Sequence, residues 1–480
     1  MRSLVFTLAL IWSGVALAQG GETAPARPAL LPQDVLAASE AHFPTILQAL
    51  AKRQVAEGKV TEALGAFDVV FAADGFDRVD GFYDGTALGG KVLKPLRPLG
   101  AQLYGQYSLS NGDFPIYEDE YFTNTGGTAK LGVLFSLLRD RDIDARRFGQ
   151  IDAELALAQA DLEVLLTKVG VQQRALDAYW QWVATGQQLA VYENLLTIAL
   201  ERESALEREV NSGRRAAIFL TENKQNITRR QTLATAAERD FQIAANRLAF
   251  YYRDVEGNPL EPSEDQLPEE SVLGEFPELP TMGSLDVPEL LSRRPELQIL
   301  QTGAERALQK IAVSENELKP RLDLNAEVAE GFGAIGEGGA SREGTDVVVG
   351  FTFSVPLERR QAKGKITQAR AELESLRQEQ RRVEDQVEIE LRTILLELAN
   401  ARKLMALAEQ DVVLSETMRL AEIRRFEQGA SDFFLVNIRE ETAADARVRY
   451  FEAYQRTRVA QANFDVATVN MERLGISPDA

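Results

Sequence analysis

The sequence predicts a mainly α-helical fold of long antiparallel helical hairpins, with a smaller β part in each half of the chain. Three observations predict this class. One stretch near the C-terminus lacks helix breakers over an unusual length, and two Gly-rich regions alternate in polarity as strands do. In addition, the second half of the chain repeats the order of elements of the first.

The stretch from Lys365 to Gln428 contains neither Gly nor Pro, and Gly429 follows it. As one helix it is about 95 Å long, several times the ordinary globular length. Its apolar residues recur at a spacing of seven in two offset rows, which predicts helical neighbours on two sides. The rows are Leu373, Val387, Ile394, Ala401 and Ala408, and Leu391, Leu398, Met405 and Val412.

A second long helix is expected from Ile151 to Glu209, with the same spacing of apolar residues. Shorter helices are expected over residues 33–64, 215–252, 288–318 and 431–474, the third interrupted at Pro295. In each half, two short helices laid end to end match one long helix. The Pro-rich, acidic segment between the halves is therefore expected where the short helices meet, as a collar around the middle.

Strands are expected in two regions, 67–138 and 320–357. The clearest alternation runs over 99–109, 321–328 and 345–357, as in strands that separate two unlike media, and a weaker one over 130–138. Pro95 and Pro98 predict a tight turn between two strands. The first region is about twice as long as the second, which indicates either an added strand pair or a large outer loop.

The two halves of the chain correspond in sequence. Gly132 and Leu155 match Gly350 and Leu373 at one constant offset, and each half has one Gly after its long helix, Gly213 and Gly429. We interpret this as an internal duplication. The predicted organisation is a signal peptide (1–18), a flexible N-terminal segment (19–32), a first repeat (33–252), a connector (253–287), a second repeat (288–474) and a C-terminal tail (475–480).

Composition and the N-terminus indicate an exported protein. Arg2, an apolar run and the Ala16-Leu17-Ala18 site are typical of a secretory signal. The 53 basic and 73 acidic residues give a net charge of −20, which argues against nucleic acid as a partner. The chain has no Cys and no later apolar run of about 20 residues, so a membrane crossing would have to be a β-barrel.

Enzymatic chemistry finds little support in the sequence. His42 is the only His and lies on a predicted helix beside Phe43, where packing or surface exposure explains it. There is no nucleophile elbow, zinc-ligand spacing or phosphate loop. The Gly-rich segment 331–344 is read as a loop tip, since no helix N-terminus follows it. We therefore expect no catalytic, cofactor-binding or metal-binding residues.

Several motifs resemble the outer-membrane efflux (TolC-like) family over nearly all of the mature chain. Arg294-Pro295-Glu296-Leu297 resembles its R-P-[DE]-L motif, and Pro320-Arg321-Leu322-Asp323-Leu324 resembles its P-x-L-x-L strand entry. Phe353-Ser354-Val355-Pro356-Leu357 resembles its F-x-x-P-L return strand. Arg425-Phe426-Glu427-Gln428-Gly429 resembles its r-[FY]-x-x-G turn at the periplasmic tip.

This resemblance implies a homotrimer in which strands from three chains close one outer-membrane β-barrel and helices continue it as an α-barrel across the periplasm. The implied function is a channel, the passive exit duct of a tripartite efflux pump or type I secretion system in a Gram-negative-type envelope. The implied partners are outer-membrane lipid, a periplasmic adaptor (membrane fusion) protein and an inner-membrane transporter. The rival interpretation is a periplasmic structural coiled-coil tether without a pore.

The two Gly turns are the predicted site of adaptor docking and gating. Apolar residues on an exposed helical tip indicate a surface for a helical partner, and local packing of each hairpin is the alternative. Family members usually carry an acid six positions after the tip Gly, where this chain has Phe219 and Leu435. A ring of acids is therefore not expected. The predicted site comprises Gly213, Arg214, Arg215, Ile218, Phe219, Phe426, Gly429, Ser431, Asp432, Phe433 and Leu435.

Overall fold

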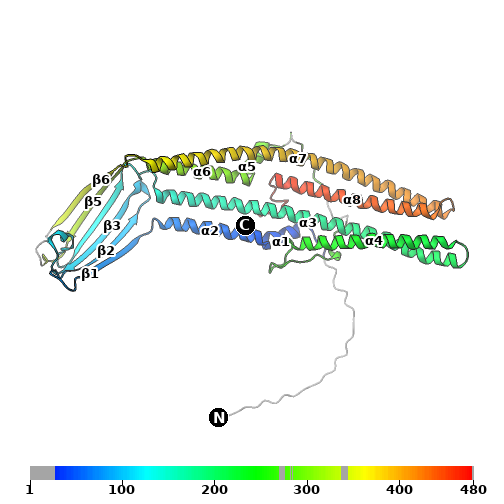
Figure 1. Ribbon diagram of the computed structural model, residues 1–480, viewed down its shortest axis with the longest axis horizontal. Coiled ribbons are helices and arrows are strands. Elements are labelled where there is room, and N and C mark those ends of the chain that lie inside the picture. The colour runs from blue at the N-terminus through cyan, green and yellow to red at the C-terminus, as the bar shows by residue number, and fades with distance from the viewer. Residues whose placement is uncertain (1–27, 270–275, 282, 284, 337–343, 478–480) are drawn as a thin grey trace, which may run out of the picture.

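The computed structural model describes residues 28–269, 276–281, 283, 285–336 and 344–477. The predicted signal peptide lies outside the described residues, as do most of the N-terminal segment and parts of the connector, the 331–344 loop and the C-terminal tail. The molecule is elongated, with a β-sheet at one end and a layer of helices running away from it (Figure 1).

Along the described chain, helices are followed by strands and then by helices, and this order occurs twice. The helices are α1 (Pro32–His42), α2 (Pro44–Gly65), α3 (Ala145–Asn211), α4 (Ala217–Ala249), α5 (Val287–Arg293), α6 (Pro295–Asn316), α7 (Arg360–Glu427) and α8 (Phe433–Ala467). The strands are β1 (Val70–Asp77), β2 (Thr86–Pro95), β3 (Gln102–Asn111), β4 (Thr128–Ser136), β5 (Arg321–Gly331) and β6 (Thr345–Ser354). Short 3₁₀ turns cover Pro98–Gly100, Ile116–Tyr121 and Glu264–Gln266.

The strands form one six-stranded antiparallel sheet in the order β1-β2-β3-β4-β5-β6. The first predicted strand region therefore holds an added strand pair, since β1 to β4 all lie within it. The turn predicted at Pro95 and Pro98 joins β2 to β3. Strand β4 pairs with β5, which joins the two halves of the chain. Strands β1 and β6 are left as the two edges of the sheet.

One face of the sheet is apolar and open to the surroundings. The register aligns Leu88 with Leu109, Leu131 with Val328 and Val328 with Val347, so these side chains share one face. The exposed apolar residues of this face are Phe71, Leu88, Val92, Leu103, Tyr107, Leu109, Leu131, Val328, Val347, Val349, Phe351 and Phe353. The opposite face is polar, and its residues include Lys91, Tyr104, Gln106, Lys130, Asn325 and Glu327.

The helices lie side by side in one layer (Figure 1). Helices α2 and α4 both pack along α3, and α6 and α8 both pack along α7. The short helices thus run end to end beside the long ones, as predicted. Helices α3 and α7 begin six and five residues before their predicted starts, and both end within two residues of their predicted ends.

Two predicted helix boundaries are wrong. The helix expected over 33–64 is broken between α1 and α2. Pro44 has no backbone N–H to donate to a helical carbonyl, and it disfavours a helical conformation at Phe43. The last helix ends at Ala467 and not near Leu474, and the chain turns there to bring Leu474 and Ile476 onto the bundle.

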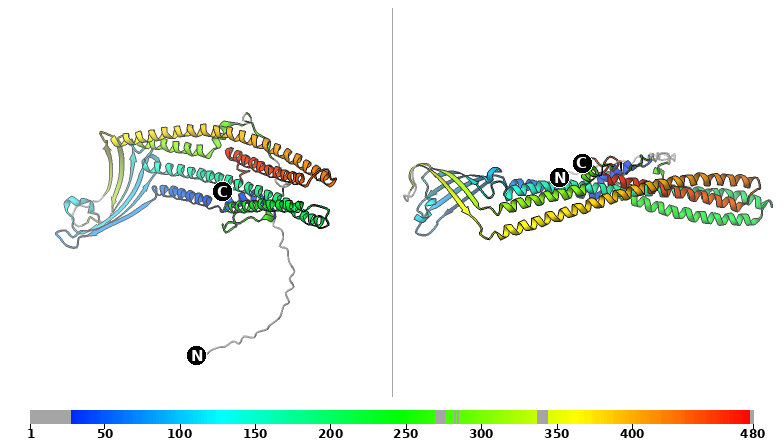
Figure 2. Two further views of the ribbon diagram at one scale, coloured as in Figure 1. Left: turned by 45° about the vertical axis from the view of Figure 1, so that its right-hand side comes forward. Right: turned by 90° about the horizontal axis from the view of Figure 1, so that it is seen from above.

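One face of the helical layer is covered at its middle, where the short helices meet. The cover, which we call the collar, consists of α1, the connector near Gln266 and residues 468–477 after α8. Figure 2 (right) shows α1 and the C-terminal end on the same side of the layer. The main hydrophobic core lies beneath them, and Trp182 of α3 is fully buried in it. The Tyr179 hydroxyl donates a 2.9 Å hydrogen bond to the carbonyl oxygen of Leu30. The collar therefore fixes the N-terminal end of the described chain to α3.

Among the helices that the structure describes, none combines the length and the apolar character needed to span a bilayer.

Candidate functional site at the helical tips

Each helical hairpin turns through the same left-handed Gly motif. Gly213 and Gly429 have φ of 71° and 73°. In the first turn the backbone N–H of Gly213 bonds the Val210 carbonyl (2.9 Å) and that of Arg214 bonds the Glu209 carbonyl (3.0 Å). The second turn repeats both bonds, at 3.0 and 2.8 Å. This pair of bonds satisfies the last helical carbonyls and reverses the chain, and Gly adopts the required φ without strain.

The aromatic residues of the two turns pack against each other. Phe433 is only 1% exposed, and its ring centroid lies 6.4 Å from that of Phe219 and 6.2 Å from that of Phe426. The Arg215 guanidinium lies 5.5 Å from the Phe219 ring and 5.2 Å from the Phe426 ring. Residues from both hairpins thus form one Arg–aromatic cluster. Phe433 is not available to a docking partner, because this packing encloses it.

A second contact between the hairpins lies further along the helices. Arg230 of α4 and Glu440 of α8 are both buried. The Arg230 guanidinium donates to the Glu440 carboxylate (2.8 Å) and to the Leu195 carbonyl (2.9 Å). Arg202 of α3 also binds the Glu440 carboxylate. Although burial alone raises the pKa of Glu440, the hydrogen bonds and charges of the two arginines outweigh it and hold that pKa below its usual range.

An apolar surface remains exposed on the outside of this tip. Ile218 on α4 is 65% exposed and Phe434 on α8 is 60% exposed. Leu435 and Ile438 on α8 are also exposed. Phe434 and Ile438 are four residues apart and so lie on one side of the helix. We call these four residues the tip patch.

Three polar residues predicted at the tip have structural partners. Asp432 is the N-cap of α8, where its carboxylate accepts a 2.8 Å hydrogen bond from the backbone N–H of Leu435. The Ser431 hydroxyl donates to the Glu422 carboxylate, which also pairs with Arg425 (3.4 Å). Arg214 bonds the Ser212 hydroxyl at 2.9 Å. Asp432 therefore does not replace the acid that the family usually carries six positions after the Gly.

The Arg294-Pro295-Glu296-Leu297 motif marks the place where α6 and α8 meet end to end. Pro295 begins α6, and the buried Arg294 donates to the carbonyl oxygens of Val466 and Ala467 at the end of α8, both at 3.3 Å. Glu296 lies 3.8 Å from Arg294, and Leu297 is buried. The motif thus caps one helix while it starts the next.

The other family motifs lie where strands join helices. Pro320 directly precedes β5, and its carbonyl accepts a 3.2 Å hydrogen bond from the backbone N–H of Arg139. Pro356 and Leu357 follow β6 and are exposed. Arg359 then adopts a φ of 53° at the N-cap of α7. Pro320 thus lies where the chain passes from the helical layer into the sheet, and Pro356 to Arg359 lie where it returns to the helical layer.

Comparisons with known proteins place the fold. No protein-family profile matches the chain, and no curated protein sequence matches it. Solved structures do match. The outer membrane protein VceC of Vibrio cholerae aligns with a TM-score of 0.59 and 16% identity, over 91% of this chain and 95% of VceC.

Two outer membrane channels give similar values. The open state of MtrE from Neisseria gonorrhoeae aligns with a TM-score of 0.63 and 13% identity, over 93% of this chain and 89% of MtrE. CmeC of Campylobacter jejuni aligns with a TM-score of 0.60 and 12% identity, over 98% of both chains. The fold that the resemblance implies for the single chain is confirmed, because this chain shares it with solved outer-membrane channels.

Proposed function

We propose that this protein is an outer-membrane channel, the exit duct of a tripartite efflux pump or of a type I secretion system. One observation carries the proposal. The sheet exposes a continuous apolar face, and this face belongs to a chain whose helical layer is polar and uncovered on one side. An exposed apolar face of this size is stable in contact with lipid, whereas a polar face is stable in contact with water. The sheet spans the outer membrane and the helices extend into the periplasm.

The duct is a homotrimer. Within the described residues of one chain, β1 and β6 each pair on one side only and so form the two edges of the sheet. In the helical layer, α7 exposes Leu396, Leu407 and Leu414 on one side. At the other edge, α4 exposes an uncharged row at spacings of four and three: Thr221, Gln225, Thr228 and Thr232. These edges meet between subunits, so that three sheets close one barrel and three helical layers continue it.

The protein performs no reaction and supplies no energy. Its mechanism is passive passage through a water-filled tunnel that is gated at the helical tips. A periplasmic adaptor and an energised inner-membrane transporter provide the energy and select the cargo. Within the part of the chain that the structure describes, no group of three or more His, Cys, Asp or Glu side chains is placed to hold a metal ion.

The tip patch is the docking surface for the adaptor. Ile218, Phe434, Leu435 and Ile438 are apolar and exposed at the end of the molecule farthest from the sheet. The Arg–aromatic cluster beneath them holds the two hairpins together. A helical partner gains most from such a patch when its support is rigid, because less conformational freedom is lost on binding.

A periplasmic coiled-coil tether without a pore is not favoured. A tether needs no lipid-facing surface, whereas this chain exposes apolar side chains across the whole width of its sheet. The fold comparisons are also with outer-membrane channels.

Export in cells tests the proposal and the docking surface together. We expect the chain to restore export in a strain that lacks its own copy but keeps the adaptor and transporter. The double variant Phe434→Ala/Ile438→Ala should lose export and adaptor cross-linking while it keeps its amount in the outer membrane. Glu441→Gln, on the same helix, is the matched control and should export normally. Export by the double variant at the wild-type level would contradict docking at the tip patch.

A further inference from the structure

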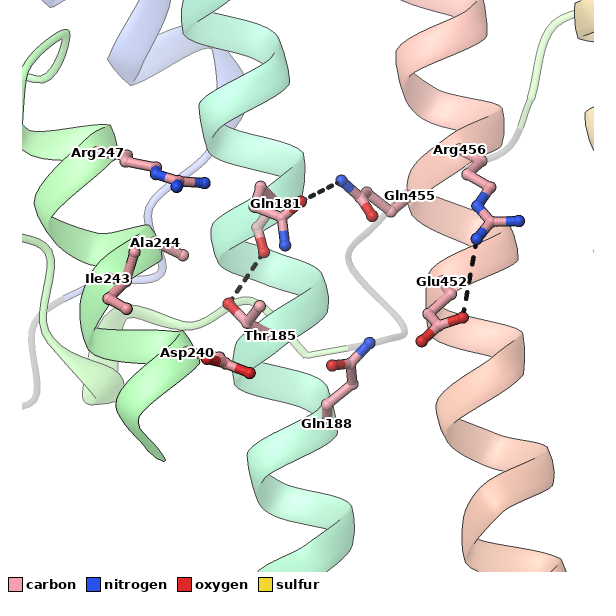
Figure 3. A pocket seen from close by; sticks show the side chains of 10 residues that line it. All are labelled: Gln181, Thr185, Gln188, Asp240, Ile243, Ala244, Arg247, Glu452, Gln455 and Arg456. Atoms are coloured by element: carbon pink, nitrogen blue, oxygen red, sulfur yellow. Dashed lines mark hydrogen bonds and ion pairs between the residues drawn. The ribbon is translucent and has the colours of Figure 1, made fainter. Parts of the chain in front are cut away.

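The uncovered face of the helical layer contains an elongated groove. Two adjoining pockets of 410 and 560 Å³ share Gln181, Arg247 and Gln455. Helix α3 forms the floor, and α4 and α8 form the walls (Figure 3). The Gln455 side chain donates a 2.6 Å hydrogen bond to Gln181 across the floor. Each pocket is within the size range of sites for small organic ligands.

The groove lies on the side of α3 away from the collar. Its floor runs from Gln188 to Arg174, about 21 Å along the helix. Tyr179 and Val183 lie roughly half a turn around the helix from these residues, and both are buried under the collar. In the proposed trimer the side away from the collar lines the tunnel, so the groove opens to the path of the cargo.

The charges of the groove leave two guanidinium groups free. Glu452 pairs with Arg456 (4.0 Å), and Asp240 pairs with Arg239 (2.6 Å), which lies outside the groove. Arg174 and Arg247 have no ion pair within the described residues and are exposed. In Figure 3 the Arg247 side chain extends from α4 toward α3.

The groove has one further acid, which lies in the larger pocket. Asp177 lies on the floor of the larger pocket, and burial raises the pKa of its carboxyl group. One of its carboxylate oxygens is buried without a hydrogen-bond partner in the described structure. The lining thus carries three arginines and three acids and is balanced as a whole, but Arg174 and Arg247, the two arginines without an ion pair within the described residues, both line the larger pocket.

The larger pocket adds an apolar surface next to the free arginines. Ala178, Phe250, Tyr251 and Val459 line it, and the Phe250 ring is exposed to the groove. Arg247 stands where this apolar pocket joins the polar one. A ligand that spans this junction contacts aromatic surface at one end and guanidinium groups at the other.

We propose that this groove is a transit site for amphipathic organic anions, molecules with a rigid apolar body and one carboxylate or sulfonate group. The apolar body packs on Phe250, Tyr251 and Val459, and the acid group binds Arg247, with Arg174 as the second cation. Guanidinium suits such groups because it donates two parallel hydrogen bonds. The inference rests on the proposed channel function and names a class of cargo for it.

Channel block tests this site in the full-length trimer. In a planar bilayer, 8-anilinonaphthalene-1-sulfonate added on the helical side should reduce the conductance. Arg247→Gln should raise the half-blocking concentration about tenfold, the loss of one charge-assisted hydrogen bond, and Arg247→Lys should fall between. The neutral analogue N-phenyl-1-naphthylamine, which lacks only the sulfonate, should block weakly. Arg229→Gln, an exposed arginine elsewhere on α4, is the matched control and should block as the wild type does.

Fluorescence of the same sulfonate, bound to protein held in an amphipathic polymer, gives a second readout that needs no conductance. Binding should weaken in Arg247→Gln and stay unchanged in Arg229→Gln. Equal binding and block in wild type and Arg247→Gln would overturn the site, as would equal block by the neutral analogue. If the protein conducts but the sulfonate does not block it, the groove site is wrong and the channel function stands. If the protein does not conduct, the proposed channel function is wrong, and the fluorescence binding of wild type and Arg247→Gln still tests the site.

Discussion

Arg230 of α4 and Glu440 of α8 form an ion pair with an N–O distance of 2.8 Å, and their side chains are 0% and 1% exposed. The two residues belong to different hairpins, so the pair joins the halves of the chain close to the tips. Arg202 completes the site from α3. Since both side chains are buried, removal of one partner leaves the other charged and buried.

We expect Glu440→Gln to destabilise the helical end of the molecule. The uncompensated Arg230 should cost on the order of 3–5 kcal/mol in free energy of unfolding. Thermal unfolding followed by circular dichroism measures the loss. Glu441→Gln is the matched control, because its partner Arg229 is largely exposed, and it should cost at most about 1 kcal/mol. A similar stability of the two variants would contradict a structural role for the buried pair.

The contribution of Glu440 to the stability of the fold should depend on pH only below about pH 5. Its pKa in the folded protein is lowered, so the stabilisation is fully present above the unfolded value of about 4.3 and is lost as pH falls through the folded pKa. We expect the difference in melting temperature between wild type and Glu440→Gln to be constant from about pH 8 to pH 5 and to shrink below about pH 4. A difference that vanishes near pH 6 would show that the pKa is raised instead.

Substitution of the Gly in a tip turn should destabilise the protein because of its backbone conformation and not because the new side chain lacks room. A Cβ at Gly429 meets nothing within 4 Å, but φ is 73°, so Gly429→Ala should destabilise the tip by about 1 kcal/mol. Gly364 in α7 also has open space, with a helical φ, and Gly364→Ala should stabilise by up to about 1 kcal/mol. Chemical denaturation of the two variants compares them, and effects of the same sign would contradict the expectation.

The two faces of the sheet should respond differently to charge. Phe351 and Thr352 are neighbours on β6 and point to opposite faces. Phe351→Arg should lower the yield of assembled outer-membrane protein, because a charge facing lipid costs about 2–4 kcal/mol near the midplane. Thr352→Arg, on the polar face, should assemble normally. The amount of heat-modifiable trimer in outer-membrane fractions is the measurement, and equal yields would contradict a lipid-facing Phe351.

Some features were predictable because their signals are local. The long helix α7 was expected within a few residues of its observed ends, since Gly and Pro mark where such a helix stops. The break at Pro44 was missed even though the residue is a helix breaker, because the helical pattern continues on both sides of it. Ile438 was missed as well, although its spacing of four from Phe434 places both on one side of α8.

Other features depend on contacts that no local pattern encodes. The partners Arg230 and Glu440 are 210 residues apart, and each reads as a solvated helical charge by itself. Phe433 and Phe434 are adjacent aromatic residues at the same helix start, yet one is buried and the other exposed. The difference arises because Phe219 and Phe426 of the two hairpins enclose only the first.

Conductance of the purified, full-length protein in a planar bilayer tests the central claim most directly. The channel interpretation predicts discrete, reproducible conductance steps from a detergent-extracted trimer. Extraction into buffer without detergent, together with no conductance steps at any voltage, would contradict it and favour a tether without a pore.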